Sequence, residues 1–261
     1  RARYGLMLRE DGVVFDDGTT ARIGEYRYFM TTTTANAGKV MSHLEQLLGV
    51  VWPALRVQVT SVTDHWASMA LAGPRSRDVL ARALGGAGVS NESLPYMGVL
   101  DGAISGFPTR IFRISFSGEL AYEINTPAGY GLAVWQALLA AGRDADIVAY
   151  GTEAMGVLRI EKGHVAGAEL DGRTTAADLG LGRLVAMNKP DFIGKHLLDR
   201  PALADVARPQ LVGLVPVDGK TRLRGGAQLV EDPDAPLPAT MLGHVTSVAW
   251  SPALGHPIGL A

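Results

Sequence analysis

A glutamate, Glu123, lies within a strongly apolar stretch of the chain, ISFSGELAYEI at residues 114–124. The glycine in this stretch predicts a turn between two strands whose side chains alternate between faces. In the second strand, Glu123 then points to the opposite face from Leu120, Tyr122 and Ile124. The ordinary interpretation of this pattern is a charged residue on the solvent face of a half-buried strand.

Glu123 also has a functional interpretation. A carboxylate carries two coplanar acceptor oxygens, which match a heterocycle with adjacent N–H and NH2 donors. Reduced pteridines have such a donor edge. The aromatic side chains of Phe116 and Tyr122 are close enough in sequence to pack against the ring or its aryl extension. The residue pattern therefore leaves two interpretations open, a solvated glutamate and a pteridine-binding glutamate.

Two further groups are candidates for chemistry. Asp16 and Asp17 end an apolar strand, where aspartate commonly enters a turn but is also placed to take or donate a proton. Arg159 and Glu161 lie on a predicted helix that begins near Thr152, and their spacing of two residues puts them on different faces. Charge on the helix surface is the default interpretation for this second pair.

Composition excludes several classes of function. The 261 residues are 47% hydrophobic with a net charge of -2, and no basic run interleaved with aromatic residues favours nucleic acid. The absence of cysteine excludes disulfides, thiolate metal sites and thiol catalysis, and the six histidines have no metal-ligand spacing. No apolar stretch approaches the ~20 residues of a membrane span. We therefore expect a cytoplasmic protein that binds neither membrane nor nucleic acid and holds no metal.

The predicted elements mix strands and helices without regular β-α-β alternation, which favours an antiparallel α+β core. Strands are expected within 5–17, 26–34, 56–73 (two strands around residues 63–65) and 109–125, with the polar segment 18–25 as a connection. Helices are expected at 36–49, 76–84, 128–142 and 152–163, the last capped by Thr152 and ended by Gly163. From residue 200 onward, short strands such as 210–217 and 243–250 predict a separate β module.

Five motifs together resemble the glycine-cleavage T-protein (aminomethyltransferase) superfamily. SFSGELAYEI is similar to the family's G-Y-T-G-E-x-G-x-E hairpin, and DGVVFDD, GVLRIEKG, KPDFIGK and GHVTSVAWSPALG occur in the family's order. TEAMGVLRIEKG and EKGHVAGAELDGRTTAADLGLGRL look closest to the C-terminal folate-binding half of the alpha subunit of heterotetrameric sarcosine oxidases. The resemblance covers essentially the whole chain.

The resemblance implies a fold and a division of the chain. Residues 1–199 would form the α+β folate-binding core, and residues 200–261 a C-terminal β-barrel domain. The chain begins at Arg1 without methionine and stops in an apolar stretch. We therefore expect part of a longer protein, with the first elements of the core and the last strands of the barrel missing.

The resemblance also implies roles for individual residues in tetrahydrofolate-dependent one-carbon transfer. The glutamate that holds the pteridine falls on Glu123, and the family's folate-contacting aromatic residue, usually tyrosine, falls on Phe116. Further folate contacts are expected from Tyr122 and Arg159. The catalytic aspartate falls on Asp16 or Asp17, because Phe15 leaves the register open by one residue, and Asp16 is preferred.

The activity that the resemblance implies is capture of the one-carbon unit of oxidised sarcosine, which forms 5,10-methylenetetrahydrofolate and glycine. FAD, FMN and NAD, together with further sarcosine oxidase subunits as partners, would belong to other parts of the complex. The alternatives are a stand-alone aminomethyltransferase, a dimethylglycine or dimethylsulfoniopropionate enzyme, and a non-catalytic folate-binding scaffold or sensor. Met155, which replaces an arginine of many T-proteins, argues against the stand-alone aminomethyltransferase.

Overall fold

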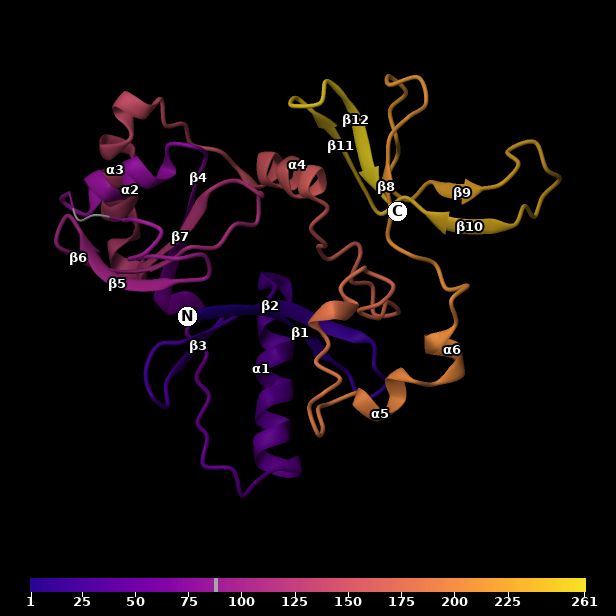
Figure 1. The fold of residues 1–261 in the computed structure, drawn as a ribbon, viewed down its shortest axis with the longest axis horizontal. Helices are drawn as coiled ribbons and strands as arrows, with labels where there is room; N and C mark the ends of the chain where they lie inside the picture. Colours follow the sequence, from indigo (N-terminus) through magenta and orange to yellow (C-terminus); the bar gives the residue numbers. More distant parts are fainter. Residues whose placement is uncertain (87–88) are drawn as a thin grey trace. The chain divides into compact units, whose positions relative to one another are not determined.

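The computed structural model describes residues 1–86 and 89–261 as a mixed α+β chain (Figure 1). Contacts divide it into two units, one made of residues 1–4 and 18–150 and the other of residues 5–17 and 151–261. The chain passes between the units within two strands, β1 (Ala2–Leu8) and β2 (Val14–Arg22). None of the described helices is long and apolar enough to cross a membrane.

The first unit is built on a four-stranded antiparallel sheet with the order β4-β7-β6-β5. Its strands are β4 (Trp66–Ala72), β5 (Val99–Ile104), β6 (Phe107–Phe112) and β7 (Ala121–Pro127). β5 and β6 are joined by a two-residue turn, Ser105 and Gly106, with φ values of 50° and 81°. Positive φ at both positions suits the right-handed twist of a hairpin.

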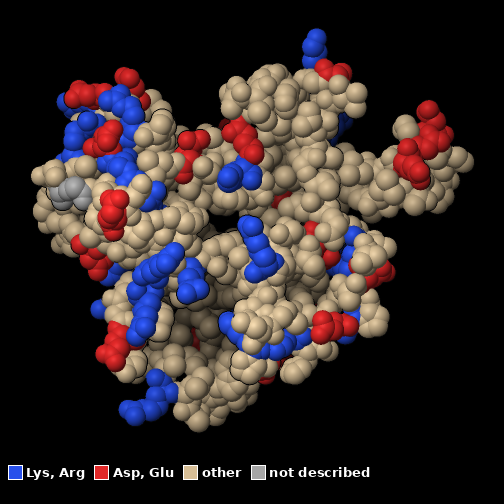
Figure 2. Space-filling model, in the orientation of Figure 1, with Lys and Arg blue, Asp and Glu red and all other residues tan. Residues whose placement is uncertain are grey.

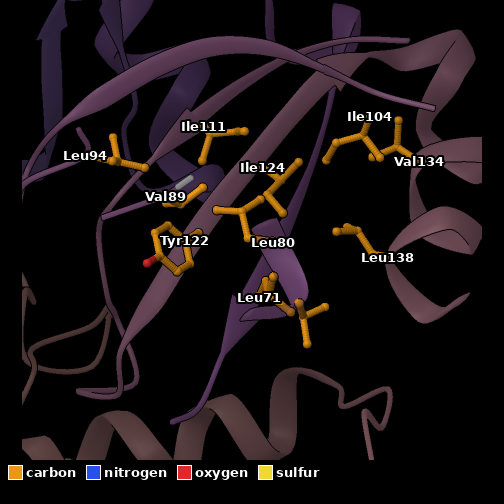
Figure 3. Packing of buried hydrophobic residues seen from close by; sticks show 11 residues of the cluster. Leu71, Leu80, Val89, Leu94, Ile104, Ile111, Tyr122, Ile124, Val134 and Leu138 are labelled. Carbon is orange, nitrogen blue, oxygen red and sulfur yellow. The ribbon is translucent and has the colours of Figure 1, made fainter. Parts of the chain in front are cut away.

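One face of this sheet is covered by α2 (Ser76–Ala83) and α3 (Gly131–Ala141). The period-two alternation of the strands directs apolar side chains to this face. Together with side chains of the two helices and of the segment before β5, they form the main core of the unit, shown in Figure 3. Its members are Leu71, Val79, Leu80, Val89, Leu94, Ile104, Ile111, Tyr122, Ile124, Val134 and Leu138.

The remaining part of the first unit contains β3 (Tyr28–Met30), which pairs with the second half of β2. The helical segments are η1 (Thr34–Asn36), α1 (Ala37–Gln46), η2 (Leu47–Val51), η3 (Thr63–His65), η4 (Ala128–Tyr130) and η5 (Arg143–Ala145). Two sequence predictions fail here. Residues 18–22 continue β2 instead of forming a connection, and residues 56–62 form no strand, because no neighbouring strand pairs with them.

The second unit contains α4 (Thr152–Lys162), η6 (Gly182–Leu184), α5 (Lys195–Leu198) and α6 (Pro201–Ala204). α4 ends at Gly163 as predicted, where a φ of 75° favours glycine, but its N-cap is Gly151 and Thr152 is its first residue. α4 packs on the C-terminal strands through an apolar cluster of Ile160, Ile258 and Leu260.

The C-terminal strands are β8 (Gly213–Leu214), β9 (Gln228–Val230), β10 (Met241–His244), β11 (Ser247–Ser251) and β12 (His256–Leu260). They form a three-stranded sheet, β11-β12-β8, and a two-stranded sheet, β10-β9. The prediction of short strands after residue 200 is confirmed, but these described strands do not close into a barrel. In Figure 2, acidic side chains gather at the end of the β9–β10 hairpin, whose loop contains Glu231, Asp232 and Asp234.

Candidate functional site

Glu123 lies in the middle of β7, the second of the four strands of the sheet in the first unit. It is directly opposite Ala70 of β4 and Phe112 of β6, and by strand alternation it faces away from the core residues Tyr122 and Ile124. This orientation is the one predicted from the sequence. The carboxylate is half-buried, and burial raises the pKa of Glu123 above its ordinary value.

Within residues 1–86 and 89–261, the Glu123 carboxylate has no hydrogen-bond or ion-pair partner. A carboxylate removed from water without compensating donors is costly, and such groups occur preferentially at functional sites. The sheet face around Glu123 therefore presents an acceptor that a ligand with N–H donors would satisfy.

An aromatic cluster occupies the same sheet face. Phe29 of β3 stacks on Phe112 with ring centroids 5.7 Å apart and meets Trp66 edge-on at 5.6 Å. The guanidinium of Arg110 lies over Phe29 and Trp66, at 5.6 and 5.5 Å from the ring centroids. Arg110 also donates two hydrogen bonds, of 2.7 and 3.0 Å, to Asp101, and thereby lowers the pKa of that carboxyl.

Asn125 is a second polar residue on the Glu123 face, two positions further along β7 and opposite Ser68 and Arg110. Its side chain is buried, and its Nδ2 has no hydrogen-bond partner among the described residues. Sequence reasoning missed both Asn125 and the aromatic cluster. The period-two spacing of Glu123 and Asn125 was a signal for the first, whereas the cluster depends on pairing between distant strands.

Phe116 lies outside the sheet, which corrects the prediction that residues 114 and 116 belong to the first strand of the hairpin. β6 ends at Phe112, and residues 113–120 form a loop. Arg113 still exchanges backbone hydrogen bonds with Gly98 and Met97, and the chain then turns through Gly118, whose φ is 84°. Phe116 is 40% exposed.

Tyr122 is completely buried in the core, on the opposite face of β7 from Glu123. Burial raises the pKa of its hydroxyl, against the opposing effect of the charges of Arg77 and Arg113. A ring in this position is not exposed to a ligand bound at Glu123. Folate contact by Tyr122 therefore stays a prediction that its place in the core does not favour.

Asp16 and Asp17 belong to the second unit, in the first part of β2. Asp16 follows Val14 on the buried side of the strand and is fully buried, whereas Asp17 is half-buried. The backbone N–H of Val14 donates to the carbonyl of Thr174 at 3.0 Å, which ties the start of β2 to the segment after α4. Burial thus distinguishes the two aspartates that the sequence left as alternatives.

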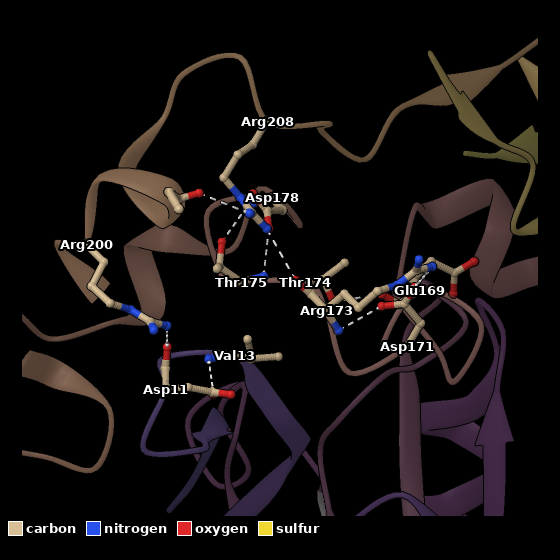
Figure 4. Close-up of polar contacts among 11 residues, drawn as sticks. Asp11, Val13, Glu169, Asp171, Arg173, Thr174, Thr175, Asp178, Arg200 and Arg208 are labelled. Atoms are coloured by element: carbon tan, nitrogen blue, oxygen red, sulfur yellow. Dashed lines mark hydrogen bonds and ion pairs between the residues drawn. The ribbon is translucent and has the colours of Figure 1, made fainter. Parts of the chain in front are cut away.

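The turn before Asp16 is held by polar contacts that Figure 4 shows. The Asp11 carboxylate accepts the Val13 N–H at 3.1 Å, and Arg200 donates to the Asp11 carbonyl at 2.7 Å. In the neighbouring segment, Asp178 accepts the Thr175 N–H at 2.8 Å and pairs with Arg208. These contacts tie the turn at Asp11 to Arg200, and the segment around Asp178 to Arg208.

Arg159 lies on α4 and is buried. Its guanidinium donates to Glu169 at 2.9 Å, to the His164 carbonyl at 3.2 Å and to Ser247 Oγ at 2.6 Å. Burial acts to raise the pKa of Glu169, but hydrogen bonds from Ser247, Thr246 and the Ala166 N–H, with the Arg159 charge, bring it below its ordinary value. These contacts join α4 to β11, and folate contact by Arg159 stays a prediction.

Comparisons with known proteins identify the family. Residues 1–189 match the GCVT N-terminal domain, and residues 210–261 match the glycine cleavage T-protein C-terminal barrel domain. The chain therefore belongs to the glycine-cleavage T-protein family, a family of folate-dependent one-carbon metabolism, and the resemblance inferred from the motifs is confirmed.

Particular relatives fall into two groups. The chain is 49% identical to sarcosine oxidase subunit alpha of Rhizobium meliloti (strain 1021) and 47% identical to that of Corynebacterium sp. (strain P-1), each match covering the whole chain. It spans 26% and 27% of the length of these relatives. It is also 34% identical to an aminomethyltransferase of Streptomyces coelicolor, covering the whole chain and 68% of that relative.

The fold matches a solved structure, glycine cleavage system aminomethyltransferase T from Bartonella henselae. The TM-score is 0.82 at 26% identity, and the match covers all of this chain and 67% of that one. The α+β class is therefore as predicted. The predicted boundary between residues 199 and 200 lies between the two family matches and stays a prediction.

Proposed function

We propose that this chain is the tetrahydrofolate-binding module of a sarcosine oxidase alpha subunit. The observation that carries the proposal is the half-buried Glu123 carboxylate, which has no partner among the residues that the structure describes. Family membership and the identity to sarcosine oxidase alpha subunits support the same conclusion. Further subunits, with FAD, FMN and NAD, would belong to the rest of the parent protein.

The residues of this chain fit a reduced pteridine. The two oxygens of Glu123 accept hydrogen bonds from an adjacent N–H and NH2 pair, which compensates for the burial of the carboxylate. The exposed ring of Phe116 offers an apolar surface to the aryl part of the ligand. When bound, tetrahydrofolate supplies the nitrogen nucleophiles that accept a one-carbon unit.

Asp16 is the proposed proton acceptor in the transfer. Its carboxylate is fully buried at the end of the apolar first part of β2, so it acts from a fixed position shielded from water. Glu123 binds and orients the folate, so most of the rate acceleration comes from proximity.

Product analysis of the full-length protein tests the proposal. During sarcosine turnover, a one-carbon unit that is not captured leaves as formaldehyde after hydrolysis. With tetrahydrofolate present, we expect 5,10-methylenetetrahydrofolate to replace formaldehyde, and Glu123→Ala to restore formaldehyde release while sarcosine consumption continues. Formaldehyde release that does not respond to tetrahydrofolate in the unmodified protein would contradict the proposal.

One alternative function has support of its own. Aminomethyltransferases match the whole chain at 34% identity, which favours a stand-alone aminomethyltransferase as the second candidate. Under that function the protein would not consume sarcosine, so the same assay separates the two.

A further inference from the structure

Two arginines of the first unit converge on a single acceptor. Arg77 of α2 donates to Asn91 Oδ1 at 2.7 Å, and Arg113, which follows β6, donates to the same oxygen at 2.9 Å. The two guanidinium nitrogens therefore lie within about 6 Å of each other. The other hydrogen bonds of this pair go to the backbone carbonyls of Val89 and Leu94, at 2.9 and 3.1 Å.

The pair has no counter-ion. Across residues 1–86 and 89–261, neither Arg77 nor Arg113 forms an ion pair with a carboxylate, although Glu92 and Asp78 are nearby. Three arginines whose side chains are mostly enclosed each have one: the pairs are Arg110–Asp101, Arg159–Glu169 and Arg208–Asp178. Two like charges that share a neutral amide oxygen repel each other, so this position favours a negative charge closer than any carboxylate of the described residues.

Two buried hydroxyl groups nearby also lack an acceptor. Tyr122 is completely buried, yet its hydroxyl has no hydrogen-bond partner among the described residues, and both arginine charges act on it. Figure 3 shows this hydroxyl directed away from the aliphatic side chains of the core. Ser115, two residues after Arg113, likewise has a buried Oγ for which the described part of the chain offers no partner.

We propose that Arg77, Arg113 and the Tyr122 hydroxyl form a binding site for a small oxyanion, a carboxylate or a phosphate. Guanidinium groups bind both kinds of anion through paired N–H donors, and a hydroxyl adds a further donor. Tyr122 lies on the opposite face of β7 from Glu123, so this site is separate from the proposed pteridine contact. The proposal therefore does not depend on the proposed function.

The test measures the unfolding temperature of the full-length protein against increasing inorganic phosphate or glutamate, with chloride at matched ionic strength as the reference. We expect a saturable rise with at least one of the two anions beyond the effect of chloride. The anion that gives it identifies the source, phosphate or carboxylate. No rise beyond chloride with either anion would overturn the proposal.

Three variants distinguish an anion-binding site from an arrangement in which the two arginines only hold the loop in place. Arg113→Gln removes one charge-assisted donor and should weaken the apparent affinity about 10-fold or more. Asn91→Asp places a carboxylate between the two arginines, so it should raise the unfolding temperature without added anion and abolish the anion effect. Arg82 is an exposed arginine on the same helix as Arg77, so Arg82→Gln should keep the anion effect. An unchanged anion effect in Asn91→Asp and Arg113→Gln would also overturn the proposal.

Discussion

At the scale of single residues, Glu123 differs from two buried carboxylates, those of Glu169 and Asp178. Glu169 and Asp178 are paired with arginines, and their hydrogen bonds bring their pKa values below the ordinary range against the effect of burial. Glu123 has burial alone, which raises its pKa. Among the described residues, a half-buried carboxylate without a partner is therefore a candidate for contact with a ligand.

The raised pKa of Glu123 has a consequence for stability. The folded state favours the protonated carboxyl, so the contribution of Glu123 is favourable at low pH and is lost as pH rises through its raised folded-state pKa. We expect Glu123→Gln to unfold at a higher temperature than the unmodified, folate-free protein above that pKa, with a weaker dependence on pH.

Thermal unfolding of both proteins between about pH 4 and pH 9 checks this expectation, because this range begins near the ordinary pKa of glutamate and extends upward, in the direction of the shift. Glu119→Gln, which changes an exposed glutamate in the adjoining loop, is the matched control and should leave the pH dependence unchanged. A lower unfolding temperature for Glu123→Gln than for the unmodified protein at high pH would contradict this expectation. It would show that a group of the protein stabilises the ionised Glu123 carboxylate.

Variants of Asp16 and Asp17 distinguish folate binding from one-carbon transfer. Asp16→Asn keeps the shape of the side chain and removes the proton acceptor, so methylene transfer should slow by about 10²- to 10⁴-fold while folate affinity stays nearly unchanged. Asp17→Asn is the matched control and should have a small effect. Single-turnover rates and folate titrations measure the two properties.

Unchanged transfer in both aspartate variants, with intact folate binding, would favour a non-catalytic folate-binding module. Equal loss of transfer and affinity in Asp16→Asn would instead show that Asp16 contributes to binding.

At the scale of elements, the close approach of β2 to the residue that follows β3 depends on Gly18. A Cβ at this position would lie 2.0 Å from the carbonyl oxygen of Thr31, a backbone atom that cannot move aside alone. This contact explains why a glycine directly follows Asp17 where β2 comes against the chain after β3.

Gly18→Ala should therefore lower the free energy of unfolding by roughly 1–3 kcal/mol, the range for overpacking. Gly5→Ala in β1 is the matched control, because a Cβ there meets no atom within 4 Å. Chemical denaturation measures both variants. Equal free energies of unfolding for the two variants would mean that the Thr31 backbone moves away from β2 at little energetic cost.

The sequence correctly predicted those features that depend on a single local pattern of residues. The helix that ends at Gly163 and the orientation of Glu123 followed from periodicity and from glycine. The end of β6 at Phe112 was not predicted, because the apolar alternation of the sequence continues through Ile114 and Phe116 although the strand pairing does not. The cluster of Phe29, Trp66 and Arg110 was missed because it joins three strands far apart in sequence.

At the scale of the whole molecule, the predicted site residues are divided between the two units. Glu123 and Phe116 belong to the first unit, and Asp16, Asp17 and Arg159 to the second. The chain spans about a quarter of the sarcosine oxidase alpha subunits that it matches. We therefore expect amine oxidation and one-carbon capture to be measurable only on the full-length parent protein.

Calorimetric titration of folinic acid into the full-length protein and its Glu123→Ala variant tests whether Glu123 anchors a reduced pteridine. We expect saturable binding whose affinity falls by about 10- to 100-fold in the variant, which corresponds to the loss of a charge-assisted hydrogen bond. Equal affinity in both proteins, or no binding to either, would contradict it.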